Sequence, residues 1–133
     1  MSMSKIAKVT SDQAPKEAKN LLSAKSDTWD NKNSYKADIS VKFDKPTNVD
    51  AFGIKAGSGP SNENPHYVHL QIWTGKHKQD VIRKTSWKSK KAQEIRLWTG
   101  HLSGVTKVEF FLRNAKKTEK RMQVDELTFY QQK

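Results

Sequence analysis

The chain has 133 residues and a net charge of +11, and it contains no cysteine. A chain of this length is expected to form one domain, 1–133, that folds without a disulfide or a structural metal. The missing cysteine excludes thiol catalysis and thiolate zinc sites, and no apolar run approaches the roughly 20 residues of a membrane-spanning helix.

The N-terminus gives no sign of export. No apolar stretch follows residues 1–5, so we expect no signal peptide in this sequence. Because the repeated Met-Ser could stand in place of a removed leader, the sequence leaves both a cytoplasmic and an exported location open.

One short helix is predicted near the N-terminus, and most of the chain after it is predicted to form strands. The helix covers Pro15 to Leu22, whose apolar residues share one face. From residue 39 onward, apolar and polar residues alternate with a period of two, and turn residues interrupt the alternation. The predicted strands are 39–43, 49–55, 67–73, 80–85, 94–98, 105–113 and 123–130.

About seven short strands with little helix are typical of an antiparallel β-sandwich or jelly roll, so we assign the chain to the all-β class. Consecutive antiparallel strands reverse direction, and the loops between them therefore alternate between the two ends of the molecule. By this count, one end carries the segments 26–36, 56–66, 87–92 and 114–122. The other end carries 44–48, 74–79 and 99–104.

The positive charge is concentrated in the second half of the chain. Residues 1–66 contain 10 lysines and 8 acidic residues, whereas 67–133 contain 15 basic and 6 acidic residues. A surface whose charge serves only solubility mixes both signs throughout. The asymmetry therefore indicates an anionic partner. The alternative is a set of solvent-exposed lysines with no partner at all.

The first of the two ends gathers basic and aromatic residues, and we expect it to bind the ligand. Basic groups neutralise carboxylates or phosphates, and flat rings stack on sugars or bases. We interpret Trp87 as an exposed stacking residue, because it ends a strand and opens a basic loop, and Trp29 as a core residue. The candidate ligand-binding residues are Trp87, Lys88, Lys90, Lys91, Lys116, Lys117, Arg121, Tyr35 and His66.

The sequence shows no arrangement of catalytic or metal-binding residues. His66 and His69 are three residues apart, which on a strand points them to opposite faces. No HExxH motif, paired carboxylates or supported Ser-His-Asp order occurs. We therefore predict a binding protein that is not an enzyme, with no cofactor and no metal.

Motifs along nearly the whole chain resemble those of one known family. They comprise Asn20-Leu21-Leu22 with Thr28-Trp29, the pair 39–43 and 49–54 around Lys45-Pro46, the segment 64–72, and the closing pair 108–113 and 124–130. These segments are similar to the discoidin, or coagulation-factor type C, domains of the galactose-binding-like β-sandwiches. The resemblance implies that fold, and implies binding of glycans or phospholipid headgroups through loops at one end.

Several members of that family carry calcium near the opening motif. Here the motif's acidic and glycine positions are Ser23, Ala24 and Lys25. A lysine beside an ion that needs six to eight oxygen ligands is electrostatically unfavourable. The remaining possible ligands are Asp27, Thr28 and Glu126, and we predict no calcium site.

Three classes of function stay open. A lectin-like module that prefers an acidic glycan, such as a uronate polymer, is the favoured prediction. A nucleic-acid-binding or DNA-repair scaffold domain is the first alternative, because Ser11-Asp12 and Lys19-Asn20-Leu21-Leu22 are similar to the opening of a single-strand-break repair scaffold. A module that binds an acidic protein is the second. The sequence does not indicate the oligomeric state.

We expect a calcium chelator to leave folding and ligand binding unchanged, because Lys25 occupies an acidic position of the opening motif. Thermal melts with and without EGTA measure the effect on folding. A fall of many degrees in Tm on adding EGTA, reversed by calcium, would contradict this prediction.

Overall fold

The computed structural model describes residues 6–22, 28–88 and 90–131. Within them no helix is long and apolar enough to span a membrane. The elements are β1 (Ala7–Ser11), the 3₁₀ helix η2 (Pro15–Leu22), β2 (Trp29–Asn31), β3 (Lys36–Ala56), the 3₁₀ helix η3 (Ser61–Glu63), β4 (Tyr67–Thr74), β5 (His77–Lys84), β6 (Gln93–Arg113), β7 (Met122–Val124) and β8 (Glu126–Tyr130).

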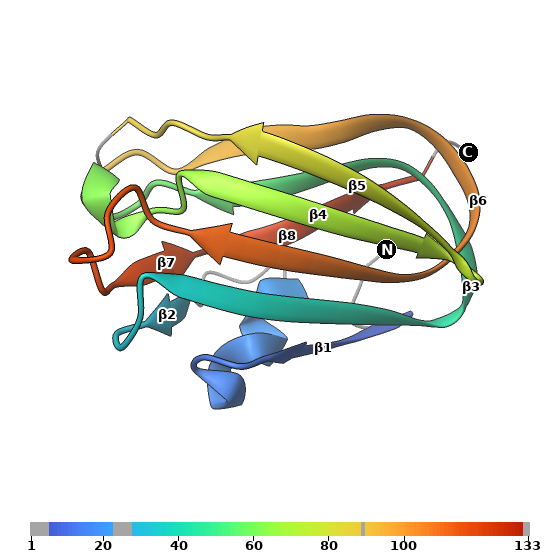
Figure 1. The fold of residues 1–133 in the computed structure, drawn as a ribbon, viewed down its shortest axis with the longest axis horizontal. Helices are drawn as coiled ribbons and strands as arrows, with labels where there is room; N and C mark the ends of the chain where they lie inside the picture. Colours follow the sequence, from blue (N-terminus) through green and yellow to red (C-terminus); the bar gives the residue numbers. More distant parts are fainter. Residues whose placement is uncertain (1–5, 23–27, 89, 132–133) are drawn as a thin grey trace.

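Two long strands, β3 and β6, run through both layers of an antiparallel β-sandwich (Figure 1). The first half of β3 and the second half of β6 lie in one layer, whose order is β1, β3, β6, β4 and β5. The other halves of the same two strands pair in the second layer, where β8 adds to β3. The predicted all-β sandwich is confirmed.

The predicted turns at 44–48 and 99–104 lie inside β3 and β6, so the prediction of separate strands on either side was wrong. Both strands bend there together, and the register shifts at several points between Lys42 and Ala51. Such bulges let a strand bend sharply while its pairing continues on both sides. Pro46 and Gly104, which has a left-handed φ of 73°, accommodate the bend rather than ending the strands.

Two short strands were missed by the sequence analysis. β1 pairs with β3 at the edge of the larger layer, and β2 pairs with β7 in a separate two-stranded ribbon. β2 has only three residues, and β1 is the five-residue segment Ala7–Ser11, whose alternation was not recognised. The predicted helix Pro15–Leu22 is confirmed as the 3₁₀ helix η2, with Ala18, Leu21 and Leu22 buried.

The core lies between the two layers and continues under η2. Trp29 is fully buried there, and its Nε1 donates to the carbonyl oxygen of Gln13 at 3.2 Å. The prediction that Trp29 is a core residue is confirmed. The fully buried large side chains are Trp29, Phe52, Phe110, Leu21, Ile39, Ile54, Leu70, Ile72, Leu97, Leu112, Met122 and Leu127.

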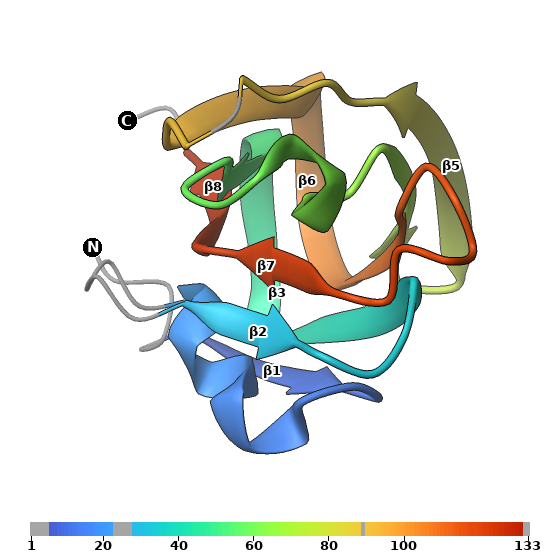
Figure 2. The same cartoon turned by 90° about the vertical axis from the view of Figure 1, so that its left-hand side faces the viewer.

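The described parts of the segments 26–36, 56–66, 87–92 and 114–122 lie together at one end, which faces the viewer in Figure 2. Backbone hydrogen bonds connect them: Asn114 donates to Tyr35 at 2.7 Å and Lys91 donates to Gly57 at 2.7 Å. Alternating strand direction is sufficient to explain this placement. We call this end the loop end.

We expect Trp29→Ala to lower the free energy of unfolding by about 3–5 kcal/mol, because it leaves a large cavity in the core. Urea denaturation measures the loss. Ile82→Ala is the matched control, since the Ile82 side chain is 69% exposed and should change stability by at most about 0.5 kcal/mol. Equal stability of the two variants would contradict the placement of Trp29 in the core.

Candidate functional site

A hollow of about 260 Å³ opens at the loop end, where β4 begins and β5 and β6 end. The sheet register creates its floor, because Tyr67 pairs with Lys84 on one side and with Arg113 on the other. The residues that line it are Tyr35, Tyr67, Lys84, Arg113, Asn114, Ala115 and Lys117. We call this the loop-end hollow.

Cations adjoin the tyrosine rings of the loop-end hollow. The guanidinium carbon of Arg113 lies 5.0 Å from the centroid of the Tyr67 ring, and Nζ of Lys36 lies 6.0 Å from that of Tyr35. The face of an aromatic ring attracts a cation, and this attraction stabilises such placements. Within the described part of the chain, no carboxylate forms an ion pair with Arg113, Lys84 or Lys117. Their charges are therefore free to meet an anion.

A second hollow of about 330 Å³ continues from the first over the outer face of the larger layer, and the two share Tyr67 and Arg113. Its apolar wall contains Ile82 and Phe111. His69 lies between them in register, with its ring centroid 5.5 Å from that of Phe111. Lys36 and Asp38 also line this second hollow. The two hollows form one strip that is basic and aromatic at the loop end and mostly apolar beyond it.

Asp80 anchors the imidazole of His69 beside this strip. Its Oδ1 lies 2.7 Å from Nε2 of His69, and that hydrogen bond is the main cause that lowers the pKa of Asp80. The pair holds the imidazole over the sheet and beside Phe111. The apolar part of the strip therefore has an imidazole of fixed position at its centre.

Asn114 holds the loop that walls the loop-end hollow. It is 2% exposed, and its Nδ2 donates to the carbonyl oxygens of Glu119 and Arg121, both at 2.6 Å. Its backbone N–H donates to Tyr35. One buried amide thus joins both ends of the 115–121 loop to the segment that carries Tyr35, and it fixes the shape of the hollow.

Arg121, a predicted ligand-binding residue, serves as a cross-link at the loop end. Its Nη2 lies 3.0 Å from Oδ2 of Asp30, and its Nε lies 3.2 Å from Oε1 of Glu63. The hydrogen bond and the charge of Asp30 raise the pKa of Arg121. Two carboxylates already compensate its charge, and it does not line the hollow.

The interpretation of Trp87 as an exposed stacking residue was wrong. Its side chain is 7% exposed, and its Nε1 donates to the carbonyl oxygen of Pro65 at 2.6 Å. Thr85 donates to the same oxygen through its hydroxyl group. The chain after β5 folds over the segment that leads to β4, and the indole fills the space between them. That long-range packing has no signal in the neighbouring sequence.

The basic loop around Trp87 does not line the loop-end hollow. Lys88, Lys90 and Lys91 are exposed, and the loop is attached to the 57–59 segment by backbone hydrogen bonds. In Figure 2 the segment around η3 lies between this loop and the 114–122 loop. The predicted basic face is thus divided into two parts.

The other predicted site residues lie at or near the loop-end hollow. Tyr35 and Lys117 line it, and Lys116 is exposed beside Lys117. His66 is half-buried, and its Nδ1 lies 2.9 Å from the carbonyl oxygen of Asn64. The structure therefore brings together Tyr35 and Lys117 and separates them from Lys88, Lys90 and Lys91.

Sequence reasoning did not name Asn114 and Ala115 as site residues, and it missed the three lining residues that lie on strands, Tyr67, Lys84 and Arg113. Each of these three was interpreted only as part of a strand, Tyr67 and Arg113 as terminal residues and Lys84 within 80–85. Their common position at the loop end follows from the pairing of β4 with both β5 and β6. The available signal was a strand that begins with an aromatic residue next to strands that end with basic ones.

The positions named for calcium are engaged in other contacts or lie outside the described residues. Asp27 is one of the latter, Thr28 donates to Asp125 at 3.0 Å, and Glu126 lies 3.3 Å from Nζ of Lys55. Among the described residues, no group of three or more His, Asp or Glu side chains gathers to hold a metal ion.

A chain of contacts at the opposite end joins Ser103, His101 and Asp50. Oγ of Ser103 lies 3.4 Å from Nε2 of His101, and Nδ1 of His101 lies 2.6 Å from Oδ1 of Asp50. The order is that of a hydrolytic triad, but the His101 side chain is 62% exposed. Neither it nor Ser103 lines any of the three hollows described in this structure. We assign no catalysis to these residues.

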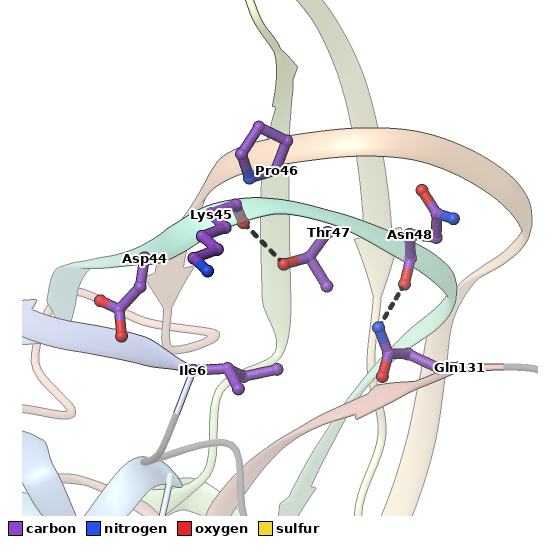
Figure 3. A pocket seen from close by; sticks show the side chains of 7 residues that line it. All are labelled: Ile6, Asp44, Lys45, Pro46, Thr47, Asn48 and Gln131. Atoms are coloured by element: carbon purple, nitrogen blue, oxygen red, sulfur yellow. Dashed lines mark hydrogen bonds between the residues drawn. The ribbon is translucent and has the colours of Figure 1, made fainter.

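A hollow of about 460 Å³ at the same end lies over the bend of β3 (Figure 3). Its polar groups bond to one another: Thr47 donates to the carbonyl oxygen of Lys45 at 2.7 Å, and Gln131 donates to that of Asn48 at 2.9 Å. No aromatic ring is among its lining residues, and it borders the first and last described residues. It has fewer features of a binding site than the loop-end hollow.

The arrangement of strands is similar to that of several solved domains. The family 32 carbohydrate-binding module of Clostridium perfringens NanJ, in complex with galactose, has a TM-score of 0.72 at 10% identity over 96% of both chains. A Bacteroides fragilis F5/8 type C domain has 0.66 at 12% identity over 96% of this chain and 92% of its own. This chain has the galactose-binding-like fold.

A third structure of this galactose-binding-like fold is described as a pectin-binding carbohydrate-binding module. It has a TM-score of 0.68 at 12% identity, over 96% of this chain and 92% of its own. No family model and no curated protein sequence matches this chain. The similarity therefore establishes the fold, and the expected resemblance to discoidin-like domains is confirmed at that level.

We expect Trp87→Ala to lower the free energy of unfolding by about 3–5 kcal/mol, because the buried indole fills the space over Pro65. Trp87→Phe should cost less, since it keeps most of the volume and loses one hydrogen bond of about 0.5–1.5 kcal/mol, while the Pro65 oxygen still accepts from Thr85. Urea denaturation of both variants measures the difference. A fully stable Trp87→Ala variant with weakened ligand binding would restore the exposed interpretation.

Proposed function

We propose that the protein is a non-catalytic carbohydrate-binding module that holds acidic sugar residues in the loop-end hollow. The observation that supports this most directly is the set of cations around the ring of Tyr67, Arg113, Lys84 and Lys117, which form no ion pair with any described carboxylate. An acidic sugar presents both an apolar ring face and a carboxylate, and the hollow has a group suited to each.

The two kinds of side chain would divide recognition between them. A tyrosine ring offers a flat apolar surface of fixed orientation, on which the C–H face of a sugar ring can stack. The guanidinium of Arg113 can donate two parallel hydrogen bonds to one carboxylate. Lys84 and Lys117 would add attraction that tolerates small displacements of the ligand.

The adjoining strip offers a place for the next sugar along the chain. Tyr67 and His69 lie two residues apart on one face of β4, a separation of about 6.7 Å. Beside His69 the strip is lined by Ile82 and Phe111. We propose that an acidic sugar sits at Tyr67 and that its neighbour covers the apolar part of the strip.

The similar structures support the class of ligand. One was solved with galactose and another is described as binding pectin, which is an acidic polysaccharide. At 10–12% identity, no individual binding residue of those modules is transferred to this chain. The proposal for an acidic sugar therefore depends on the side chains of the hollow and on the net charge of +11.

We expect Tyr67→Ala and Arg113→Gln each to weaken binding of trigalacturonate about tenfold, because one removes the stacking surface and the other the carboxylate partner. Isothermal titration calorimetry at low and high salt separates the two effects. The loss at Arg113 should shrink at high salt, where charge is screened, whereas the loss at Tyr67 should persist.

Lys16→Gln is the matched control, because it removes one positive charge from η2, none of whose residues lines the hollow. It should leave the affinity for trigalacturonate within about twofold of the original. Tighter binding of a DNA duplex than of trigalacturonate would favour the nucleic-acid alternative. Unchanged affinity in both hollow variants would exclude the loop-end hollow as the site.

A further inference from the structure

A row of lysines crosses the outer face of the larger layer at the end remote from the loop-end hollow. The register places Lys8 opposite Lys42, Lys42 opposite Lys107, Lys107 opposite Trp73, and Trp73 opposite Lys78. Because neighbouring strands are about 4.8 Å apart, the row spans about 19 Å. The five strands follow one another across the view in Figure 1. We call these five residues the lysine row.

Repulsion between neighbouring lysines of the lysine row lowers the stability of the fold. Like charges directly opposite one another on neighbouring strands are destabilising, and three lysines in succession occupy such positions on β1, β3 and β6. Lys107 is compensated by Glu109, at 2.6 Å. Lys8 and Lys42 are exposed, and neither pairs with a carboxylate among the residues that the structure describes.

Trp73 supplies an aromatic surface within the row. Nζ of Lys107 lies 5.3 Å from the centroid of its ring, and Nζ of Lys78 lies 5.7 Å from it. Its Nε1 is buried and has no hydrogen-bond partner within the described part of the chain. A large ring held between two ammonium groups on an outer face repeats the combination of aromatic and basic side chains found at Tyr67.

We propose that the lysine row is a second binding site, which takes an extended acidic polysaccharide laid across the strands. Each strand advances the row by a distance close to the length of one sugar ring, so successive carboxylates can face successive ammonium groups. The class of ligand rests on the proposed function, but the site does not, because it shares no residue with the loop-end hollow.

The row favours a polysaccharide over a single-stranded nucleic acid. Proteins that bind single strands stack successive bases on several aromatic rings, and the lysine row contains one ring, Trp73. Tyr67 is the next aromatic residue on that face of β4, six residues or about 20 Å away. A row of ammonium groups with one aromatic ring suits a ligand that is bound through a carboxylate on each residue and not through stacking of each residue.

The test compares two double variants that lose the same charge. The row variant, Lys8→Gln with Lys42→Gln, removes the two lysines of the row that form no ion pair with a described carboxylate. The control, Lys16→Gln with Lys19→Gln, removes two exposed lysines of η2. At low salt, the row variant should bind polygalacturonate about tenfold more weakly than the original protein, and the control should stay within about twofold.

Trigalacturonate separates this site from the loop-end hollow, because three sugar rings are too short to reach from one to the other. The row variant should bind trigalacturonate with unchanged affinity, whereas Arg113→Gln should weaken that binding about tenfold. One outcome is that neither the original protein nor any variant binds trigalacturonate, while the row variant still binds polygalacturonate more weakly than the original. The proposed function would then fail, and the proposed site at the lysine row would stand. If Arg113→Gln alone affects both ligands, the hollow remains and the row is excluded.

Lys8→Arg with Lys42→Arg keeps both charges and should restore binding of polygalacturonate. Thermal melts check folding, and the row variant should melt no lower than the original protein, since it relieves repulsion between lysines. Equal losses in the row variant and the η2 control would show that net charge alone governs binding and would overturn the proposal. Tighter binding of oligo(dT) than of polygalacturonate at the row would assign it to nucleic acid.

Discussion

The continuous pairing of β3 with β6 is the constraint on which the rest of the structure depends. Both strands leave one layer, bend together through shifted register, and enter the other layer still paired. This connects the two layers by hydrogen bonds and closes one end of the core. It also places the second half of β6 between β3 and β4, so that β4 pairs with β6 and not with β3.

That strand order determines which side chains meet on the outer face. One row brings Tyr67 between Lys84 and Arg113 at the loop end, and another brings Trp73 between Lys78 and Lys107 near the bend. Between these rows lie Asp80 and Glu109, which compensate part of the charge. The face therefore presents two basic and aromatic regions. Between them lie an apolar row with His69, Ile82 and Phe111 and an acidic row with Asp80 and Glu109. The two proposed sites are centred on the basic and aromatic regions.

At the loop end, the structure distinguishes basic residues that stabilise the fold from those that remain available. Arg121 compensates two carboxylates and joins three segments. Arg113 adjoins a tyrosine ring and has no ion pair with a described carboxylate. Trp87 and Tyr67 differ in the same way, one packed over Pro65 and the other lining a hollow. The chemical type of a residue does not separate these roles, but its partners do.

The sequence by itself determined the all-β class, the helix Pro15–Leu22, the core position of Trp29 and the end of the sandwich at which loops gather. Each depends on local periodicity or on the alternation of antiparallel strands, which short segments retain. Only the tertiary structure decided that β3 and β6 continue through their bends, that Trp87 is buried and that Tyr67, Lys84 and Arg113 meet. These outcomes depend on contacts between residues far apart in the chain, because register and packing across strands leave no pattern in either strand alone.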